Sequence, residues 1–353
     1  MRISQNIARL RTNRAFSPSG EDRLSDLADF GDNPGNLRGR LYVPATLAKP
    51  APLVVVLHGC TQTAASYDEG SGWSRLADRH GFLLLFPEQQ RANNPNLCFN
   101  WFQAGDTRRD GGEAASIRQM VDRISADHKV DPTRIFVTGL SAGGAMASVM
   151  LASYPEIFAG GAIIAGIAFG CAGSVGEAFQ CMGGRGRSSA SALGDNVRAA
   201  SDHKGPWPRV SVWHGSADPT VTASNGDDIV KQWLNVHRLR AKPDVTDTIE
   251  GYPHRVWMDA AERPLIEQYV ITGMGHGTPL DPGEAEGQSG VAGPHMLDAA
   301  ISSTDRIAAF FGVADEVVAV RPMEKHAKPA KPQRVSGVQQ VIEDALRKAG
   351  LMP

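Results

Sequence analysis

A serine between glycines is the feature that most constrains how this chain can fold. Residues 139–143 read Gly-Leu-Ser-Ala-Gly, after an apolar run with strand character at 135–138 and before an Ala- and Met-rich run with helix character at 142–151. A strand, a sharp turn and a helix in this order are typical of a nucleophile elbow, in which glycines leave room where strand and helix meet. The sequence therefore predicts that Ser141 has a strained backbone, is exposed at the top of a sheet and acts as a nucleophile.

Apolar runs alternate with helical patterns on both sides of this turn. We expect buried strands at residues 53–57, 82–86, 135–138, 159–165, 210–213 and 268–272, and helices at 72–80, 113–128, 142–151 and 229–239. This alternation predicts an α/β fold with a mostly parallel central sheet and helices on both faces. In such a fold the loops that follow the strands meet at one edge of the sheet, where ligands bind.

Composition and charge restrict the function classes. Of the 353 residues, 42% are hydrophobic and 21% are charged, which is ordinary for a globular enzyme. A net charge of -2 provides no extended positive field, so nucleic acid is not an expected partner. Residues 1–16 contain arginines but no continuous apolar stretch. As written, we expect a cytoplasmic protein without membrane association, or a secreted one if a signal peptide preceded this numbering.

We expect one large domain with appendages. The predicted catalytic domain spans residues 41–312 and follows an N-terminal extension at 1–40. Within it, residues 166–208 are rich in Gly, Ser and Ala, and they form either a lid over the sheet edge or an exposed loop without a binding role. A linker at 313–334 then leads to a C-terminal helix at 335–353, which we expect to dock on the body or on a second copy in a homo-oligomer.

Four cysteines allow two disulfide bonds in three alternative pairings. We favour Cys60 with Cys98 and Cys171 with Cys181, the second pair closing a short loop. The sequence has no Cys-x-x-Cys spacing and no close cluster of Cys and His, so a metal site is not expected.

An exposed serine needs a histidine to accept its proton and a carboxylate to orient that histidine. In an α/β-hydrolase these follow the serine in the order acid, then histidine. Asp218 follows the strand at 210–213 and is the expected acid, although it can also simply begin a turn with Pro219. His276 follows the strand at 268–272 and is the expected base, the alternative being a loop histidine bonded to backbone.

Other histidines fit less well. His254 and His295 also come after the acid, but His254 lacks a strong preceding strand and His295 lies in a loop with Gly and Pro. His80, His128 and His237 lie at predicted helix ends, where a surface or capping role is expected.

The stretch His58-Gly59-Cys60-Thr61 follows the first buried strand, as the oxyanion loop of esterases does. We expect the backbone N–H groups of Cys60 and Ala142 to bind the oxyanion, with Thr61 as the alternative donor and His58 as a structural residue that orients the loop. Each donor would stabilise the transition state by about 3 kcal/mol.

Aromatic residues cluster in Phe99-Asn100-Trp101-Phe102. They form either part of the core or one wall of a substrate site. We take Trp101, Asn100 and Thr61 as candidate substrate-binding residues, while Asn100 can equally hold the loop.

Several motifs together resemble the poly(3-hydroxybutyrate) depolymerase family of esterases, a branch of the α/β-hydrolases that includes feruloyl and acetyl-xylan esterases. They are Leu-His-Gly-Cys-Thr-Gln-Thr at 57–63, Cys-Phe-Asn-Trp-Phe at 98–102, Gly-Leu-Ser-Ala-Gly-Gly at 139–144, His-Gly-Ser-Ala-Asp at 214–218 and Gly-Met-Gly-His at 273–276. The resemblance covers residues 41–311. It implies that Ser141 is the nucleophile, Asp218 the acid, His276 the base and Cys60 an oxyanion donor.

The expected function is that of a serine carboxylester hydrolase that works through an acyl-enzyme and needs no cofactor. Its expected substrates are short-chain acyl esters or 3-hydroxybutyrate oligomers, because no signal peptide or polymer-binding domain is evident. Feruloyl or acetyl-xylan esters are the alternative. A non-catalytic binding protein and a peptidase remain as other classes, whereas dinucleotide binding is disfavoured because no Gly-x-Gly-x-x-Gly follows the first strand.

Overall fold

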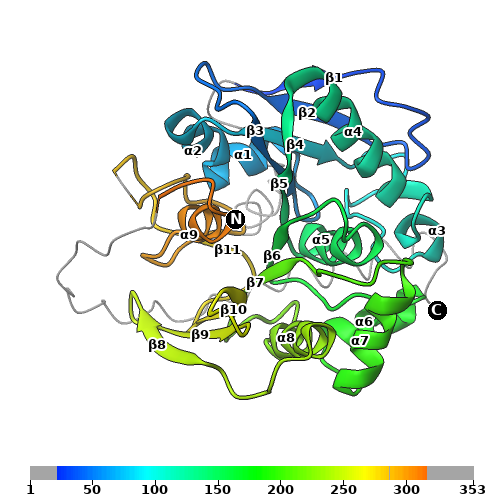
Figure 1. Ribbon diagram of the computed structural model, residues 1–353, viewed down its shortest axis with the longest axis vertical. Coiled ribbons are helices and arrows are strands. Elements are labelled where there is room, and N and C mark those ends of the chain that lie inside the picture. The colour runs from blue at the N-terminus through cyan, green and yellow to red at the C-terminus, as the bar shows by residue number, and fades with distance from the viewer. Residues whose placement is uncertain (1–21, 286, 316–353) are drawn as a thin grey trace, which may run out of the picture.

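A ten-stranded sheet forms the centre of the computed structural model, which describes residues 22–285 and 287–315 (Figure 1). Its strand order is β1-β2-β4-β3-β5-β6-β7-β10-β9-β8. The bounds are β1 Ser25–Leu27, β2 Arg38–Tyr42, β3 Ala51–Leu57, β4 Leu83–Glu88, β5 Val130–Leu140, β6 Gly160–Ile164, β7 Arg209–Gly215, β8 Val245–Ile249, β9 Tyr252–Met258 and β10 Pro264–Ile271. The run from β4 to β10 is parallel and both edges are antiparallel, which confirms the predicted mostly parallel sheet.

Helices cover both faces of this sheet, as predicted. They are α1 Ala64–Ser71, α2 Trp73–His80, α3 Ala104–Thr107, α4 Gly112–His128, α5 Ala142–Ser153, α6 Val175–Met182, α7 Ala190–Ala199, α8 Ser224–His237 and α9 Ser303–Phe311. Helices α1, α2 and α9 pack on one face, and α4, α5, α7 and α8 pack on the other (Figure 1). A small parallel pair, β11 Thr278–Leu280 and β12 Met296–Asp298, lies on the same side as α9.

The fully buried strand β3 shows why the core is continuous. Leu53, Val55 and Leu57 belong to the cluster under α4 and α5, whereas Val54 and Val56 belong to the cluster under α1 and α2. Successive strand side chains point to opposite faces, so a strand covered by helices on both sides must be apolar throughout. This run therefore identifies the sheet centre, next to the serine-bearing strand β5.

The sheet begins earlier than the predicted domain boundary at residue 41. Strands β1 and β2 begin within the predicted extension, and β2 pairs with β4 through Arg40 and Phe86. Because β2 reads Arg-Gly-Arg-Leu-Tyr and lies near a sheet edge, it lacks the apolar run that marks a central strand. Residues 22–40 are thus part of the α/β domain.

Two further regions differ from the sequence-based expectation. The β8–β9 hairpin was not predicted, because its turn at Glu250 and Gly251 lacks the usual Asn-Gly signal although both residues have positive φ. The segment at 166–208 contains α6 and α7 rather than a long irregular excursion. The predicted linker at 313–334 and the C-terminal helix at 335–353 lie outside the described residues, apart from 313–315.

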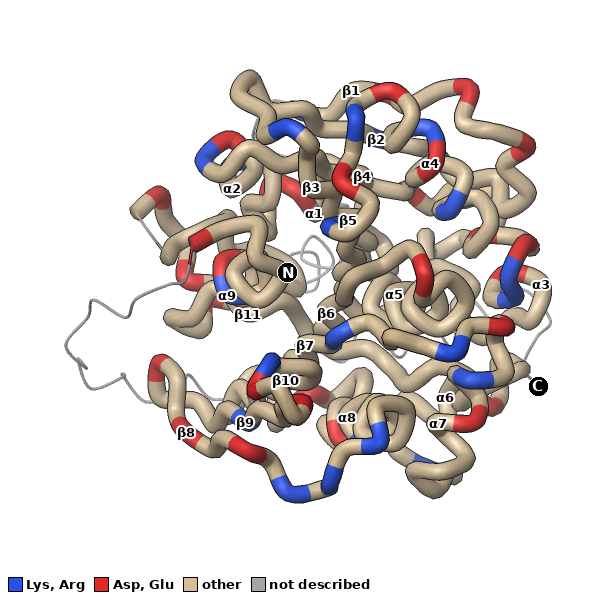
Figure 2. The backbone as a smooth tube through the Cα atoms, viewed as in Figure 1, with Lys and Arg blue, Asp and Glu red and all other residues tan. Residues whose placement is uncertain are grey.

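Basic and acidic residues are interspersed along the backbone (Figure 2). Across residues 22–285 and 287–315, no helix has the length and apolar character needed to cross a bilayer. Within the same ranges, no group of three or more His, Cys, Asp or Glu side chains is placed to bind a metal ion.

Candidate active site

Ser141 occupies a strained turn between β5 and α5. Its φ is 57° and its ψ is -117°, values that a residue with a side chain rarely adopts. A Cβ on Gly139 would lie 2.4 Å from the Gly143 carbonyl oxygen, and a Cβ on Gly143 would lie 2.3 Å from the Leu57 carbonyl oxygen. Only glycine fits both positions, so the predicted nucleophile elbow is present and presents the serine at the carboxyl edge of the sheet.

Asp218 and His276 reach the serine from the loops after β7 and β10, which are neighbouring parallel strands. The Nε2 atom of His276 lies 2.9 Å from the Ser141 Oγ atom, and its Nδ1 atom lies 2.7 Å from the Asp218 Oδ2 atom. A neutral imidazole that donates Nδ1–H to the carboxylate has its Nε2 lone pair free to accept the serine proton. The three side chains thus form one continuous hydrogen-bonded line.

Asp218 is buried and held in its ionised form. Burial by itself raises the pKa of this carboxyl, but the nearby His214 ring and the hydrogen bonds from His276 and the Val221 N–H outweigh burial and lower the pKa well below its usual range. The Oδ1 atom accepts the N–H groups of Thr220 at 2.8 Å and Val221 at 2.9 Å. Asp218 therefore both begins the turn with Pro219, the role that the sequence left open, and contacts His276.

His214 is a site residue that sequence reasoning missed. Its buried ring donates Nε2–H to the Val221 carbonyl oxygen at 2.9 Å, and the same nitrogen lies 3.6 Å from the Asp218 Oδ2 atom. These contacts hold the loop that carries the acid. The available signal was its position at the end of a buried strand, four residues before the carboxylate.

His295 contacts the proposed base through backbone. Its Nδ1–H donates to the His276 carbonyl oxygen at 3.2 Å, and the two rings meet edge to face with centroids 5.8 Å apart. The His295 carbonyl oxygen accepts the Thr278 N–H at 2.8 Å, while its φ of 62° places a bulky residue in a strained conformation. Burial lowers the pKa of His295. His295 thus hydrogen-bonds to the backbone of the loop that carries His276 instead of contacting the serine.

The other histidines lie apart from this line of hydrogen bonds. His254 is buried on β9, where its Nδ1 atom lies 2.8 Å from an Asp247 carboxylate oxygen. His80, His128 and His237 are the last residues of α2, α4 and α8, as the sequence predicts.

Two backbone N–H groups are available near Ser141. Ala142 is the first residue of α5, so its N–H has no partner within the helix. In the part of the chain that the structure describes, the Cys60 N–H also has no hydrogen-bond partner. The Thr61 N–H donates to the Asn96 carbonyl oxygen at 2.7 Å, which removes Thr61 as the alternative oxyanion donor.

His58 and a disulfide hold the loop that carries Cys60. The buried ring of His58 donates Nδ1–H to the Gly59 carbonyl oxygen at 2.8 Å, and its Nε2 atom accepts the Gln89 N–H at 3.1 Å. Burial lowers the pKa of His58, which keeps it neutral as this pattern requires. The structural role expected for His58 agrees with these contacts. Cys60 is bonded to Cys98 and Cys171 to Cys181, which confirms both predicted pairings.

The three candidate substrate-binding residues differ in position. Asn100 is buried, and its Nδ2 and N atoms donate to Glu113 at 2.8 and 2.9 Å, so this amide holds the loop. Burial raises the pKa of Glu113 to about 8. Trp101 is half-buried and packs against an apolar cluster that includes Ala145, whereas Thr61 is exposed.

A cavity of about 820 Å³ lies elsewhere, between the loop before β7 and the C-terminal end of α8. Its lining includes Trp207, His237 and Arg238, but no member of the hydrogen-bonded line. It borders the beginning of β7, whereas Asp218 follows the end of that strand. Hydrogen-bond geometry, not cavity size, therefore identifies the candidate active site.

Comparison with known proteins gives a consistent set of matches. The family model described as Esterase PHB depolymerase matches residues 37–248. Poly(3-hydroxyalkanoate) depolymerase C of Paucimonas lemoignei is 50% identical over 300 residues, which cover 85% of this chain and 72% of that protein. An acetylxylan esterase of Coprinopsis cinerea is 34% identical over 269 residues, covering 74% and 70%. The solved structure of an acetyl xylan esterase from Aspergillus awamori superimposes with a TM-score of 0.70 at 27% identity, covering 84% of this chain and all of that one.

Proposed function

This chain belongs to the esterase PHB depolymerase family and is a carboxylic ester hydrolase, and we propose that Ser141, Asp218 and His276 form its catalytic triad. The observation that carries this assignment is the pair of hydrogen bonds that His276 makes, at 2.9 Å to the serine hydroxyl and at 2.7 Å to the carboxylate. The strained backbone of Ser141 also supports it, since strain of this kind is stored at functional sites.

In the acylation step, the Ser141 oxygen attacks the ester carbonyl carbon while its proton passes to the Nε2 atom of His276. The negatively charged Asp218 stabilises the imidazolium that forms. The N–H groups of Cys60 and Ala142 donate to the carbonyl oxygen as it becomes an oxyanion. When the tetrahedral intermediate collapses, His276 returns its proton to the leaving alcohol, and the acyl group stays on the serine.

Deacylation repeats these steps with water as the nucleophile. His276 takes a proton from water, and the resulting hydroxide attacks the acyl carbon through the same oxyanion arrangement. Collapse releases the carboxylic acid and returns the proton to Ser141. Every group needed for this sequence is a side chain or backbone N–H already described.

We further propose short-chain acyl esters or oligomers of 3-hydroxyalkanoates as substrates. The 50% identity to a protein named poly(3-hydroxyalkanoate) depolymerase C supports this class. Esters of acetylated or feruloylated polysaccharide are the second candidate, favoured by the full-length structural match to an acetyl xylan esterase.

The catalytic assignment is tested by Ser141→Ala, with Ser191→Ala on the exposed surface of α7 as the matched control. Turnover of p-nitrophenyl butyrate should drop about a millionfold in Ser141→Ala and stay unchanged in the control. A fluorophosphonate probe should label wild type and the control but not Ser141→Ala. Labelling that persists in Ser141→Ala, or a wild-type protein that neither reacts nor turns over esters, would reject the proposal in favour of a binding protein.

The substrate class is tested separately with a trimer of 3-hydroxybutyrate, acetylated xylo-oligosaccharide and methyl ferulate. We expect the highest kcat/KM for the trimer. A higher value for either carbohydrate-type ester would favour the second candidate, and faster cleavage of a matched amide than of its ester would indicate a peptidase.

A further inference from the structure

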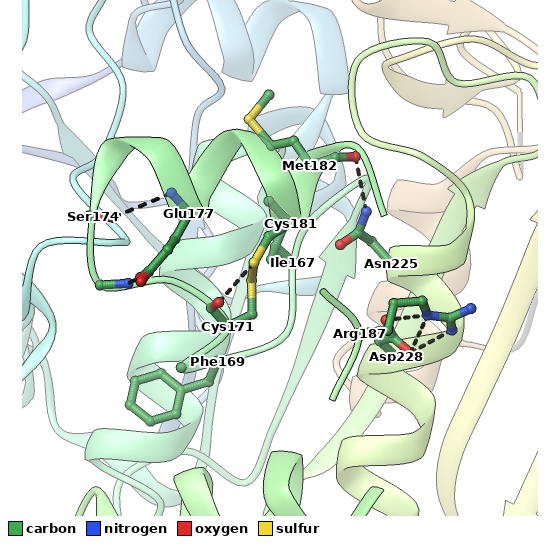
Figure 3. The surroundings of a disulfide bond; sticks show 12 residues. Ile167, Phe169, Cys171, Ser174, Glu177, Cys181, Met182, Arg187, Asn225 and Asp228 are labelled. Carbon is green, nitrogen blue, oxygen red and sulfur yellow. Dashed lines mark hydrogen bonds and ion pairs between the residues drawn. A yellow bond between two sulfur atoms is a disulfide. The ribbon is translucent and has the colours of Figure 1, made fainter. Parts of the chain in front are cut away.

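Residues 167–187, here named the disulfide segment, leave the sheet after β6 and return against α8. The bond between Cys171 and Cys181 closes a loop within it and joins the segment's start to α6 (Figure 3). The sequence left this region open between a mobile lid and a loop without a binding role. Its contacts favour a third description, a fixed wall.

An apolar cluster connects this segment to the proposed nucleophile. Its buried members are Ala145, Ile167 and Val221. The Ala145 N–H donates to the Ser141 carbonyl oxygen at 2.8 Å, so Ala145 lies one helical turn from the serine. Val221 follows the acid closely and donates its N–H to Asp218. The cluster therefore borders the catalytic line on the side of α5.

Half-buried side chains extend this cluster toward solvent, and together they form a surface here named the apolar wall. Trp101, Cys171, Cys181 and Met182 pack against the buried members, and all four have neutral side chains. Three of the four belong to the disulfide segment, so the segment supplies most of the apolar wall.

The disulfide segment is fastened to the loop that carries Asp218. The Met182 carbonyl oxygen accepts the Thr222 N–H at 2.9 Å and the Asn225 Nδ2 atom at 3.2 Å. Arg187 forms an ion pair with Asp228 of α8, and Figure 3 shows this pair beside the Asn225 contact. A crosslink at one end and hydrogen bonds at the other hold the wall at a fixed distance from the acid.

Two of the three charged side chains of the segment are engaged by protein groups, and the third, Arg185, is exposed. Glu177 accepts the Gly173 N–H at 2.7 Å within the segment, and Arg187 is engaged by Asp228. The wall thus favours an uncharged acyl group, because moving a charge against it would cost desolvation without a compensating partner.

The apolar wall and the loop that carries His276 border Ser141 from different sides. The alcohol leaves past His276. The backbone of the His276 loop accepts a hydrogen bond from His295, next to β12. Figure 1 places α6 and the β11–β12 pair on opposite sides of the line formed by β5, β6 and β7. The acyl group stays bonded to the serine after the alcohol leaves, and an acyl chain that extends toward α5, away from the His276 loop, meets the apolar wall.

We propose that the apolar wall, which the disulfide segment largely supplies, forms the acyl subsite of this esterase and limits the acyl group to short, uncharged chains. The proposal rests on the function proposed above and names the element that sets its substrate class. Each methylene that the wall removes from water strengthens binding roughly fourfold until the chain meets the segment.

The first test shortens the wall in Met182→Ala, with Phe179→Ala on the same helix as the control, because Phe179 lies on α6 and is not part of the cluster. Met to Ala removes three heavy atoms, so the acyl length with the highest kcat/KM among p-nitrophenyl acetate to decanoate should increase by about two carbons. The optimum should not move in Phe179→Ala. An unmoved optimum in Met182→Ala, or an equal shift in both variants, would overturn the proposal.

The second test removes the crosslink in the double variant Cys171→Ala/Cys181→Ala. A folded double variant should lose length discrimination, so that the ratio of kcat/KM for decanoate to that for acetate rises at least fivefold. A chain-length profile that superimposes on wild type would contradict the proposal. If circular dichroism shows that this variant does not fold, Met182→Ala decides alone.

A matched substrate pair tests the charge preference. Ethyl butyrate and monoethyl succinate have acyl chains of similar length, but the second carries a carboxylate. We expect kcat/KM for the succinate ester to be at least tenfold lower in a pH-stat assay. Equal values would overturn the uncharged class. Failure of any of these tests with acetate turnover intact leaves the triad assignment standing, whereas failure of the triad appears in Ser141→Ala.

Discussion

The triad loops and the disulfide segment both border Ser141, but they are held in different ways. Asp218 and His276 lie three and five residues beyond the ends of the adjacent strands β7 and β10, so the sheet itself sets their separation. The disulfide segment is part of the stretch that leaves the sheet between β6 and β7, and it is held by a crosslink and by contacts to the acid loop. The sheet thus positions the catalytic side chains, while the disulfide segment determines which acyl groups reach them.

If this division holds, changes in the triad loops should lower kcat for all esters alike. Asp218→Asn removes the charge that stabilises the imidazolium and favours the wrong tautomer of His276. We expect kcat to decrease about ten-thousandfold for acetate and longer esters equally. Steady-state kinetics over the chain-length series measures this, with Asp122→Asn as the control because Asp122 is an exposed residue of α4 that pairs with Arg118. A decrease below tenfold, or one confined to certain acyl lengths, would contradict the view that the triad loops act on all esters alike.

The two disulfides allow a direct contrast between the regions. The Cys60–Cys98 bond closes 38 residues and holds the loop with the proposed oxyanion donor, whereas Cys171–Cys181 closes 10. In the chain-entropy model, their removal costs about 4 and about 3 kcal/mol of unfolding free energy.

Replacing Cys60 and Cys98 by Ala should therefore lower the denaturation midpoint more than replacing Cys171 and Cys181. It should also lower kcat for every ester, without changing the chain-length profile. Urea unfolding followed by fluorescence, together with the ester series, measures both. A changed profile in the Cys60/Cys98 variant would mean that the oxyanion loop also shapes specificity.

His295 tests how far the triad region extends. His295→Ala removes the hydrogen bond to the His276 carbonyl oxygen, so the base should lose its alignment and kcat should fall about thirtyfold, with KM little changed. His295→Asn should recover most of the loss, because Asn tolerates positive φ and can donate to the same oxygen. The dependence of kcat/KM on pH should shift in the Ala variant and return in the Asn variant. If both variants behave alike, the hydrogen bond from His295 to the His276 carbonyl oxygen has no positioning role.

Glu113 predicts an effect on stability alone, without a change in kcat. Burial raises the pKa of this carboxyl to about 8 in the folded state, so the folded protein binds the proton more tightly than the unfolded chain. This contribution is fully present below the unfolded pKa near 4.5 and is lost as pH rises toward 8. The unfolding free energy should decline by about 1 kcal/mol per pH unit in this window. Glu113→Gln mimics the protonated form and should flatten the decline in thermal unfolding scans. An equally steep decline in the variant would assign it to other groups.

The sequence predicted the elements that have strong local signals. The buried strands at residues 53–57 and 135–138, and the helix at 113–128, were found because each is covered by packing that demands an apolar pattern. Strands β1, β2, β8 and β9 were missed because β1 and β8 are largely exposed edge strands, and β2 and β9 beside them carry charged or polar residues. The cytoplasmic location and the homo-oligomer stay predictions, although two disulfides are more typical of oxidising compartments.

Asn100 and Thr61 show where local pattern is insufficient. Both are polar residues in loops near the site, and sequence could not tell whether their groups face a ligand or the protein. The answer depends on hydrogen-bond partners that are not adjacent in the sequence, namely Glu113 for Asn100 and Asn96 for the Thr61 N–H. His214 and His295 were overlooked as positioning residues for the same reason, since their roles lie in single contacts to the backbone of other loops.

By itself, the sequence determined the nucleophile elbow, the order of serine, acid and histidine, and the alternation that builds a parallel sheet. These depend on local sterics and on the period of apolar residues, which are written along the chain. Only the tertiary structure decided which N–H groups remain free, which histidines support the acid and base loops, and how the disulfide segment meets Val221. These depend on distances between segments far apart in the chain, and no local pattern encodes such a distance.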